Sequence, residues 1–226
     1  MKYYISDLHF GHARIKDSID YRGFANAETM DKYMITQWNS RVREDDEVFI
    51  LGDLTVFTDG KKVNQLLKGL HGKKILIVGN HDNYLESPEF RTELFQQITP
   101  CLELQDTGRK VILSHYPIMF YNEQYRLNIE KSPKTYMLYG HVHNGPDEQV
   151  ITEYQERIRK QKRRNTVSGK TESVPCQMIN CFCMFSEYIP STLDEWIALD
   201  NIRKQGYSSA KNSPLGYGRK GAQNEK

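Results

Sequence analysis

Eight side chains that can bind a metal ion or move a proton stand directly after five short apolar runs of the sequence. They are Asp7, His9, Asp53, Asn80, His81, His115, His141 and His143. One such histidine would more often be structural, but burying this many titratable groups without partners would be costly. Nitrogen and oxygen donors without thiolate suit Mn, Fe, Zn, Co or Ni, and the candidates are too many for one ion. The residue types therefore predict a centre that holds two divalent ions.

The spacing of two pairs supports this prediction. Asp7 and His9 are two residues apart, as are His141 and His143. In an extended segment, residues two apart point the same way, so each pair could present two ligands to one centre. Two ions about 3.5–4 Å apart need a bridging carboxylate, and such ion pairs catalyse in-line attack at phosphorus.

The apolar runs that precede these residues are typical of buried strands. They show little polar alternation, as expected of strands covered on both faces. The runs are residues 2–6, 47–51, 74–78, 110–114 and 135–139. Polar groups at the carboxyl ends of such strands are where α/β proteins place their sites.

Helical spacing of apolar residues fills the gaps between these runs. It occurs at residues 28–42, 61–70 and 88–97, and Asn26 is suited to cap the first of these helices. Thr192 and Glu195 have the spacing of a capping box before a last helix. Alternating strand and helix signals predict an α/β fold, and 226 residues suit one domain.

The net charge of +2 hides a segregation of charge along the chain. Residues 157–170 hold seven Lys/Arg and no acidic residue, and residues 203–226 are also basic, so the rest of the chain is acidic. An acidic body suits cation binding. Residues 204–226 have too little apolar content to pack, so we expect a disordered tail after a single domain over residues 1–203.

An inserted segment interrupts the domain at about residues 145–177. Pro146 and the acidic residues after it predict the start of a helix over residues 146–165. The basic segment 157–170 is either a solvated helix face or a surface that contacts a nucleic-acid backbone. No aromatic residue lies among its charges, so the sequence does not predict stacking with single strands there.

The cysteines and the apolar runs indicate the compartment. The four cysteines form no C-x-x-C pair, and we expect them to be buried reduced thiols. No apolar run approaches the roughly 18–20 residues of a membrane span, and the first residues lack a secretory pattern. We therefore expect a cytoplasmic protein without a membrane partner, whose oligomeric state the sequence does not indicate.

The ordered motifs resemble those of the calcineurin-like metallophosphoesterases, most closely the small bacterial and phage members. The motifs are Asp7-Leu8-His9, Gly52-Asp53, Gly79-Asn80-His81-Asp82, Ser114-His115 and Gly140-His141-Val142-His143. Each motif alone is weak, but all five in order are specific. The resemblance spans about residues 3–144 and resumes at 178–200. It implies two packed mixed β-sheets flanked by helices, in a four-layer αββα sandwich.

The same resemblance implies a role for each ligand. Asp7, His9, Asp53 and His143 would hold one ion. Asp53, Asn80, His115 and His141 would hold the other, so that Asp53 bridges the two. A hydroxide activated by the ions would attack phosphorus, with Mn as the first choice of metal and Fe, Zn, Ni, Co or Mg as alternatives.

Three further residues are candidates for the chemistry. By the resemblance, His81 faces the phosphate and protonates the leaving group. Asp82 either orients the His81 ring or caps the loop. His12 belongs to the extended Asp-x-His-Phe-Gly-His pattern, and it either faces the substrate phosphate or a nearby carboxylate, or packs the loop.

These residues lead to one function and two rivals. The predicted activity is metal-dependent hydrolysis of a phosphate monoester or diester. The first rival is a nuclease whose basic insertion holds nucleic acid. The second is a non-catalytic scaffold, which would usually lack several of the ligands or His81.

Overall fold

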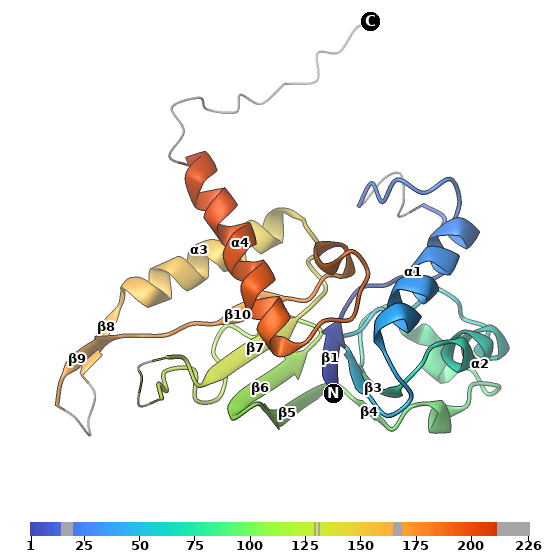
Figure 1. Cartoon of the computed structure of the whole chain (residues 1–226), viewed down its shortest axis with the longest axis horizontal. Helices are drawn as coiled ribbons and strands as arrows, with labels where there is room; N and C mark the ends of the chain where they lie inside the picture. Colours follow the sequence, from blue (N-terminus) through green and yellow to red (C-terminus); the bar gives the residue numbers. More distant parts are fainter. Residues whose placement is uncertain (15–19, 129, 131, 165–168, 212–226) are drawn as a thin grey trace, which may run out of the picture.

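The structure, a computed structural model, describes residues 1–14, 20–128, 130, 132–164 and 169–211 (Figure 1). The first of its two large sheets has the strand order β1-β2-β3-β4, with neighbouring strands parallel. Its strands are β1 (Lys2–Ile5), β2 (Glu47–Ile50), β3 (Lys73–Ile77) and β4 (Gln97–Thr99). Ile5 lies opposite Ile50 and Ile50 opposite Leu76, so the strands end at one edge.

The second sheet is mixed and has the order β10-β7-β6-β5. Its strands are β5 (Cys101–Asp106), β6 (Arg109–Ser114), β7 (Thr135–Tyr139) and β10 (Met178–Asn180). β5 runs antiparallel to β6, while β6, β7 and β10 are parallel. All five predicted strands are present, and β6 and β7 point their carboxyl ends toward the same region as β1, β2 and β3.

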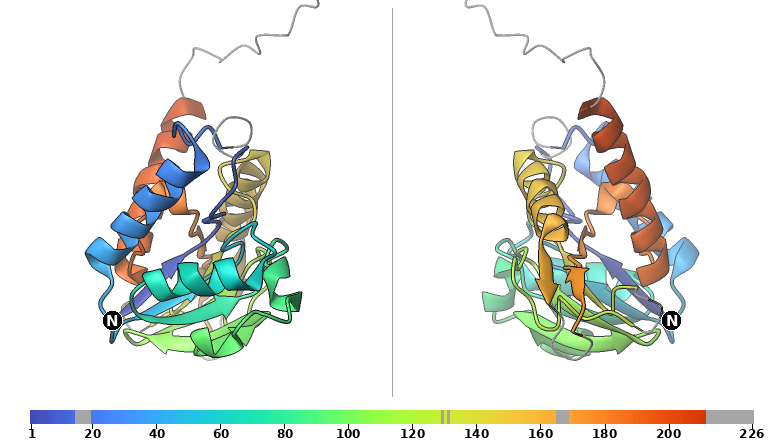
Figure 2. Two further views of the ribbon diagram at one scale, coloured as in Figure 1. Left: turned by 90° about the vertical axis from the view of Figure 1, so that its right-hand side faces the viewer. Right: turned by 90° about the vertical axis from the view of Figure 1, so that its left-hand side faces the viewer.

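Two layers of helix cover the outer faces of the sheets. Helices α1 (Ala27–Arg41) and α2 (Gly60–Gly69) pack on the first sheet, where Trp38 and Leu67 share a buried cluster with Ile50; the left view of Figure 2 looks onto α2. Helix α3 (Pro146–Lys160) packs on the second sheet, with Ile151 in a cluster with Met137.

Between the sheets lies a third cluster that includes Phe49, Ile77, Leu113 and Leu138. Trp196 of α4 (Leu193–Lys211) joins this cluster and donates from its indole N–H to the Tyr4 carbonyl. The four-layer αββα sandwich is thereby confirmed, but the first of the two sheets is parallel and not mixed as predicted. In the described part of the chain, no helix has the length and apolar character needed to span a membrane.

The predicted caps of two helices are confirmed. Asn26 accepts a hydrogen bond from the Thr29 N–H at 2.8 Å and begins α1. Thr192 and Glu195 form the reciprocal capping box of α4, because the Glu195 carboxylate accepts the Thr192 N–H at 2.8 Å and Thr192 Oγ1 accepts the Glu195 N–H at 3.4 Å.

The prediction of a helix over residues 88–97 is wrong. The segment forms a short 3₁₀ turn (Thr92–Leu94) and then β4. Asn64 of α2 binds the backbone here on both sides, donating to the Glu89 carbonyl at 2.9 Å and accepting the Arg91 N–H at 3.0 Å. These side-chain bonds replace the backbone bonds that a helix would need.

The ends of the two later helices also differ from prediction. Helix α3 ends at Lys160, and a hairpin of β8 (Lys162–Arg164) and β9 (Thr171–Ser173) follows it. Gln161 is extended and its carbonyl accepts the Val174 N–H at 3.1 Å, which starts the pairing. Helix α4 continues past Lys204 to Lys211, and within it Lys204 pairs with Asp200 at 2.6 Å. The remainder of the predicted tail lies outside the described residues.

The cysteines follow the expectation in part. All four are free thiols; Cys176, Cys181 and Cys183 are buried as predicted, whereas Cys101 is exposed at the start of β5.

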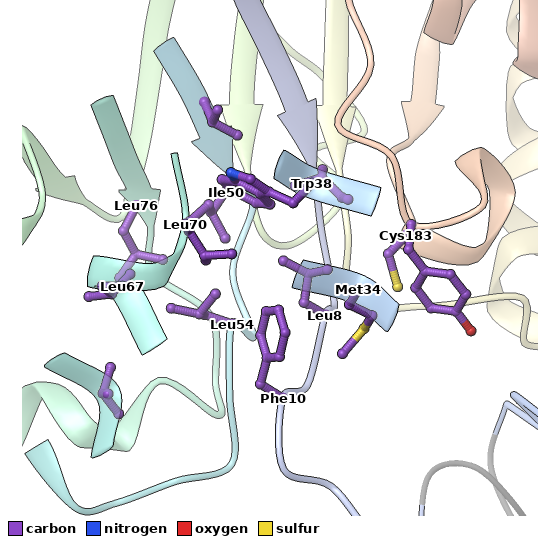
Figure 3. Close-up of a cluster of buried hydrophobic side chains, with 14 of the residues drawn as sticks. Leu8, Phe10, Met34, Trp38, Ile50, Leu54, Leu67, Leu70, Leu76 and Cys183 are labelled. Atoms are coloured by element: carbon purple, nitrogen blue, oxygen red, sulfur yellow. The ribbon is translucent and has the colours of Figure 1, made fainter. Parts of the chain in front are cut away.

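Figure 3 shows how the first loops are anchored in the core. Leu8, Phe10 and Leu54 are completely buried and pack with Met34 and Trp38 of α1. Asp7 precedes Leu8, and His9 lies between Leu8 and Phe10. Because Leu8 and Phe10 point into the core, the side chains of Asp7 and His9 can face away from it. Apolar packing thus fixes the backbone that carries the candidate ligands.

Candidate metal centre

The seven predicted ligands converge where the carboxyl ends of the two sheets meet. The first sheet supplies Asp7 and His9 after β1, Asp53 after β2 and Asn80 after β3. The second supplies His115 after β6, and His141 and His143 after β7. Residues from five strand ends therefore meet at one place.

One group of ligand atoms comes from Asp7, His9 and His143, which lie within 4.8 Å of one another. The Nε2 atoms of His9 and His143 are 3.2 Å apart, and His143 Nε2 is 3.6 Å from Asp7 Oδ1. Asp7 also forms a second compact group with Asp53 and His115.

Asp53 lies between the two halves of the centre. Its Oδ2 atom is 3.6 Å from His9 Nε2 and also 3.6 Å from His115 Nε2. On the far side, Asn80 Oδ1 lies 2.9 Å from His115 Nε2 and 2.9 Å from His141 Nδ1. The seven donors thus form two overlapping sets around one carboxylate.

The backbone presents these ligands differently from the extended segments that we predicted. Five of the seven ligands have left-handed φ angles: Asp7 (56°), His9 (50°), Asp53 (54°), His141 (72°) and His143 (47°). This conformation costs free energy for residues other than glycine and persists where the surroundings impose it, most often at functional sites. The two ligands of each pair point together because of these left-handed turns. We predicted that they would point together, but strand alternation is not the reason.

Glycines allow the loops to approach the carboxylates closely. A Cβ atom on Gly79 would lie 2.3 Å from Asp53 Oδ1, and one on Gly140 would lie 2.7 Å from Asp7 Oδ2. The motif glycines therefore leave the space that the buried carboxylates occupy.

The charge and burial of the donors fit bound cations. Asp7 is completely buried and Asp53 is 2% exposed, and burial raises the pKa of Asp7. Among the described residues, Asp7 Oδ2 has no hydrogen-bond partner. Burial and the neighbouring His143 lower the pKa of His9 to about 2, so this imidazole is neutral and able to bind a metal. A donor set of carboxylates, imidazoles and one amide suits divalent cations such as Mn, Fe or Zn.

Two residues that the sequence did not reveal hold this centre in place. Asp20 Oδ1 accepts the Nδ1–H of His143 at 2.7 Å, so that Nε2 faces the other ligands. Burial lowers the pKa of His143, but the bond to Asp20 and the charge of Asp7 outweigh this and raise it. Arg22 pairs with Asp20 at 2.8 Å and donates to the carbonyls of Asp7 and Leu8.

A third supporting residue, Asn180, is the last residue of β10, the strand that lies beside β7 in the sheet. Its amide donates to the His143 carbonyl at 2.7 Å and to Glu148 of α3 at 3.0 Å. Glu148 is 1% exposed and is paired with Arg203 of α4 at 2.6 Å. The inserted helix and the last helix are therefore connected to the loop that carries His143.

Asp82 does not orient His81 through the hydrogen bonds that the structure describes. Its carboxylate instead accepts three backbone N–H groups, those of Gly79 (2.8 Å), Leu54 (3.0 Å) and Asp53 (3.1 Å). Asp82 therefore ties the loop after β3 to the loop after β2, which is the loop-cap role given above as the alternative.

His81 and His12 line a cleft of about 760 Å³ beside the ligands. His81 is exposed, its ring centroid lies 5.3 Å from that of His9, and its N–H donates to Asp53 Oδ1 at 2.8 Å. The His12 ring lies 5.8 Å from the His9 ring and is partly exposed, and burial lowers its pKa. Both residues therefore line the cleft next to the candidate ligands.

Comparison with known proteins agrees with this site. Residues 2–167 match the calcineurin-like phosphoesterase superfamily domain. The chain is 37% identical over 144 residues to an uncharacterized protein of Methanocaldococcus jannaschii, covering 62% of this chain and 68% of that protein. It is 28% identical over 163 residues to the gene 66 protein of Mycobacterium phage D29, covering 63% of this chain and 78% of the other.

A solved structure shares the fold. A protein of unknown function from Aquifex aeolicus superposes with a TM-score of 0.58 at 24% identity, over 88% of this chain and 98% of that one. The family match covers all five ligand motifs. This chain therefore belongs to the calcineurin-like phosphoesterase superfamily.

Proposed function

We propose that the protein hydrolyses phosphate esters at a centre that holds two divalent metal ions. The observation that carries this proposal is the position of Asp53, whose Oδ2 atom is equidistant, at 3.6 Å, from His9 and His115. One carboxylate between two imidazole sets is the arrangement that a bridged ion pair requires.

The ligand sets divide as the family pattern implies. Asp7, His9, His143 and Asp53 would hold one ion. Asp53, Asn80, His115 and His141 would hold the other. Such an ion pair supplies Lewis-acid stabilisation of negative charge on a phosphoryl group and lowers the pKa of bound water. The buried carboxylates and the loop connections of Arg22 and Asp82 keep the donors in place.

His81 is the proposed proton donor to the leaving group. It is exposed in the cleft, and its backbone is fixed by the bond to Asp53, so its ring stands next to the ligands without being one of them. His12 is the second proposed contact to the phosphate, because it lines the same cleft on the side of His9. The substrate can be a monoester or a diester, and Mn is the first metal to test.

A screen of phosphate esters in Mn²⁺-supplemented buffer tests this proposal. We expect turnover of at least one class among monoesters, diesters, nucleotides and RNA. Asp53→Asn and His81→Ala should each abolish or strongly reduce it. If two ions bind per chain and no phosphate ester is hydrolysed, the non-catalytic scaffold is the better description.

A further inference from the structure

An exposed aromatic ring stands at the edge of the metal centre. Tyr116 follows His115 directly and is 49% exposed. Its ring centroid lies 4.6 Å from that of His141, and its hydroxyl donates to Asn80 Oδ1 at 3.4 Å. This half-exposed ring therefore lies directly beside two of the proposed metal ligands, His141 and Asn80.

A second exposed ring lies farther along the same loop. Phe120 is 73% exposed, although a phenyl ring normally gains free energy from burial. Its ring meets Tyr154 of α3 edge-on, with centroids 5.8 Å apart, and the Tyr154 hydroxyl donates to the Met119 carbonyl. The loop is thus fastened to α3, and Phe120 is held in place while its surface stays open.

Basic residues continue from Tyr154 along α3. Arg157 is exposed and lies three residues after Tyr154, which puts both on one side of the helix. Lys160 at the end of α3 and the three residues of β8 (Lys162–Arg164) are also exposed. Figure 1 shows α3 leading away from the sheets to this hairpin. The helix has 15 residues, so the hairpin lies about 22 Å from its start beside the centre.

We propose that single-stranded nucleic acid binds along this path, which we call the aromatic–basic strip (Tyr116, Phe120, Tyr154, Arg157 and Lys162–Arg164). An unpaired base would stack on the open ring of Phe120, and phosphates would contact Arg157 and the hairpin. The inference rests on the proposed function, because the strip ends at the centre where a phosphodiester would be cleaved.

The combination of features favours a single strand over other polyanions. A duplex or an acidic protein would use the positive charge, but neither offers a free base face to the rings. The basic segment contains no aromatic residue of its own, and the fold brings Phe120 to it from the loop after β6. The strip fits RNA and DNA equally, since none of its contacts requires a 2′-hydroxyl.

Fluorescence anisotropy with labelled oligonucleotides of about 12 nucleotides, a length within the usual range of single-strand sites, tests the inference on the full-length chain. The chain is loaded with Mn²⁺ and carries His81→Ala in every sample, so that the centre keeps its metal and the strands stay intact. The probes are single-stranded RNA, single-stranded DNA and a duplex of the same length. We expect both single strands to bind more tightly than the duplex. The RNA-to-DNA ratio then assigns the preferred sugar.

Two variants separate stacking from charge. Phe120→Leu keeps an apolar side chain but removes the ring, and it should weaken single-strand binding about 10-fold, as loss of a base–aromatic stack does. The triple variant Arg157→Gln, Arg163→Gln, Arg164→Gln should weaken it further and reduce the slope of log K against log salt by about 2, at about 0.7 per lost phosphate contact.

A matched control removes the same charge from the opposite side of the molecule. Lys61→Gln, Lys62→Gln, Lys68→Gln on α2 should bind as the unmodified chain does. Equal binding of duplex and single strand, or unchanged binding by Phe120→Leu, would overturn the inference. If simple phosphate esters are hydrolysed while single strands do not bind, the strip is wrong and the proposed function stands. Binding of single strands without hydrolysis of any ester would support the strip and contradict the proposed function.

Discussion

The Nδ1 atom of His143 lies 2.7 Å from Oδ1 of Asp20, which precedes it by 123 residues. This bond fixes the tautomer of the imidazole, so that Nε2 carries the lone pair directed toward Asp7 and His9. Arg22 pairs with the same carboxylate and holds the loop around Asp7. The position of one ligand thus depends on a side chain that binds no metal itself.

Replacing Asp20 by asparagine should lower the affinity for Mn²⁺ by about 10–100-fold, as the loss of a hydrogen-bonded partner of a ligating histidine does. Isothermal titration calorimetry on the metal-free chain measures this directly. Asp45→Asn, on an exposed carboxylate far from the centre, is the control and should not change the affinity. Unchanged affinity in Asp20→Asn would mean that the bond to His143 has no role in metal binding.

Asp53→Asn should remove the bridge between the two ligand sets. We expect fewer than two ions per chain after dialysis and loss of turnover by a factor of at least about 10³, because one of two bound charges facing the phosphate is lost. Elemental analysis and an ester assay on the same sample give both values. Asp59→Asn, at the exposed N-cap of α2, should keep metal and activity. Activity that survives Asp53→Asn would contradict the bridging role.

His81→Ala should separate chemistry from metal binding. Turnover should fall about 10²–10⁴-fold, the usual contribution of a general acid, while the metal content stays the same. The loss should be greatest for esters with poor leaving groups, since these need a proton most. A uniform loss across leaving groups would point to binding of the phosphate instead, and loss of metal would make His81 a ligand.

The pair of Glu148 and Arg203 should matter for stability. Arg203→Met leaves the Glu148 carboxylate buried without its charged partner and should lower the free energy of unfolding by about 3 kcal/mol. Urea denaturation measures the change. Lys61→Met, which breaks an exposed pair with Glu89, should cost less than about 1 kcal/mol. The double variant Glu148→Gln, Arg203→Met should recover part of the lost stability. If Arg203→Met and the control Lys61→Met cost the same free energy, this account would be contradicted.

Asp31 should make stability depend on pH. Burial raises its pKa from 3.8 to about 6, although the Gly11 N–H that it accepts and the charge of Arg22 act in the other direction. The folded chain therefore holds a proton that the unfolded chain releases, so this contribution to stability is complete below about pH 4 and is lost as the pH rises to about 6. After allowance for solvent screening, the loss is about 1 kcal/mol.

Asp31→Asn checks that expectation. Denaturation at several pH values between about 4 and 7 should show a flatter dependence than in the unmodified chain, and slightly higher stability at neutral pH. Asp59→Asn again serves as the exposed control. If the two variants gave the same dependence as the unmodified chain, Asp31 would not be the titrating group.

The strands and the ligands were predictable because both follow from local patterns. A run such as residues 75–78 is apolar throughout, as expected of a strand buried on both faces, and the polar residues directly after it must then lie at the carboxyl end of the sheet. The helix ends were less predictable. At Gln161 and Asn64, hydrogen bonds to distant backbone decide the structure, and no periodicity records such bonds.

The residues that support the site could not be found in the same way. Asp20, Arg22 and Asn180 stand in segments without a motif, and their roles arise only when the fold brings them to His143 and Asp7. The contact of Phe120 with Tyr154 is of the same kind. The left-handed angles at Asp7 and His9 are also invisible in the sequence, since non-glycine residues give no local signal for them.

Each proposed ion would draw ligands from both sheets: His143 joins Asp7, His9 and Asp53 of the first sheet, while Asn80 and Asp53 join His115 and His141 of the second. The ions would therefore crosslink the two sheets at the end of the sandwich that carries the ligands. In a cell, the free concentration of the metal would then set how firmly the two halves stay together, because a ligand that binds only the folded state stabilises it by an amount that grows with the logarithm of the free ligand concentration. Metal starvation would expose this protein to unfolding and proteolysis as well as to loss of its chemistry.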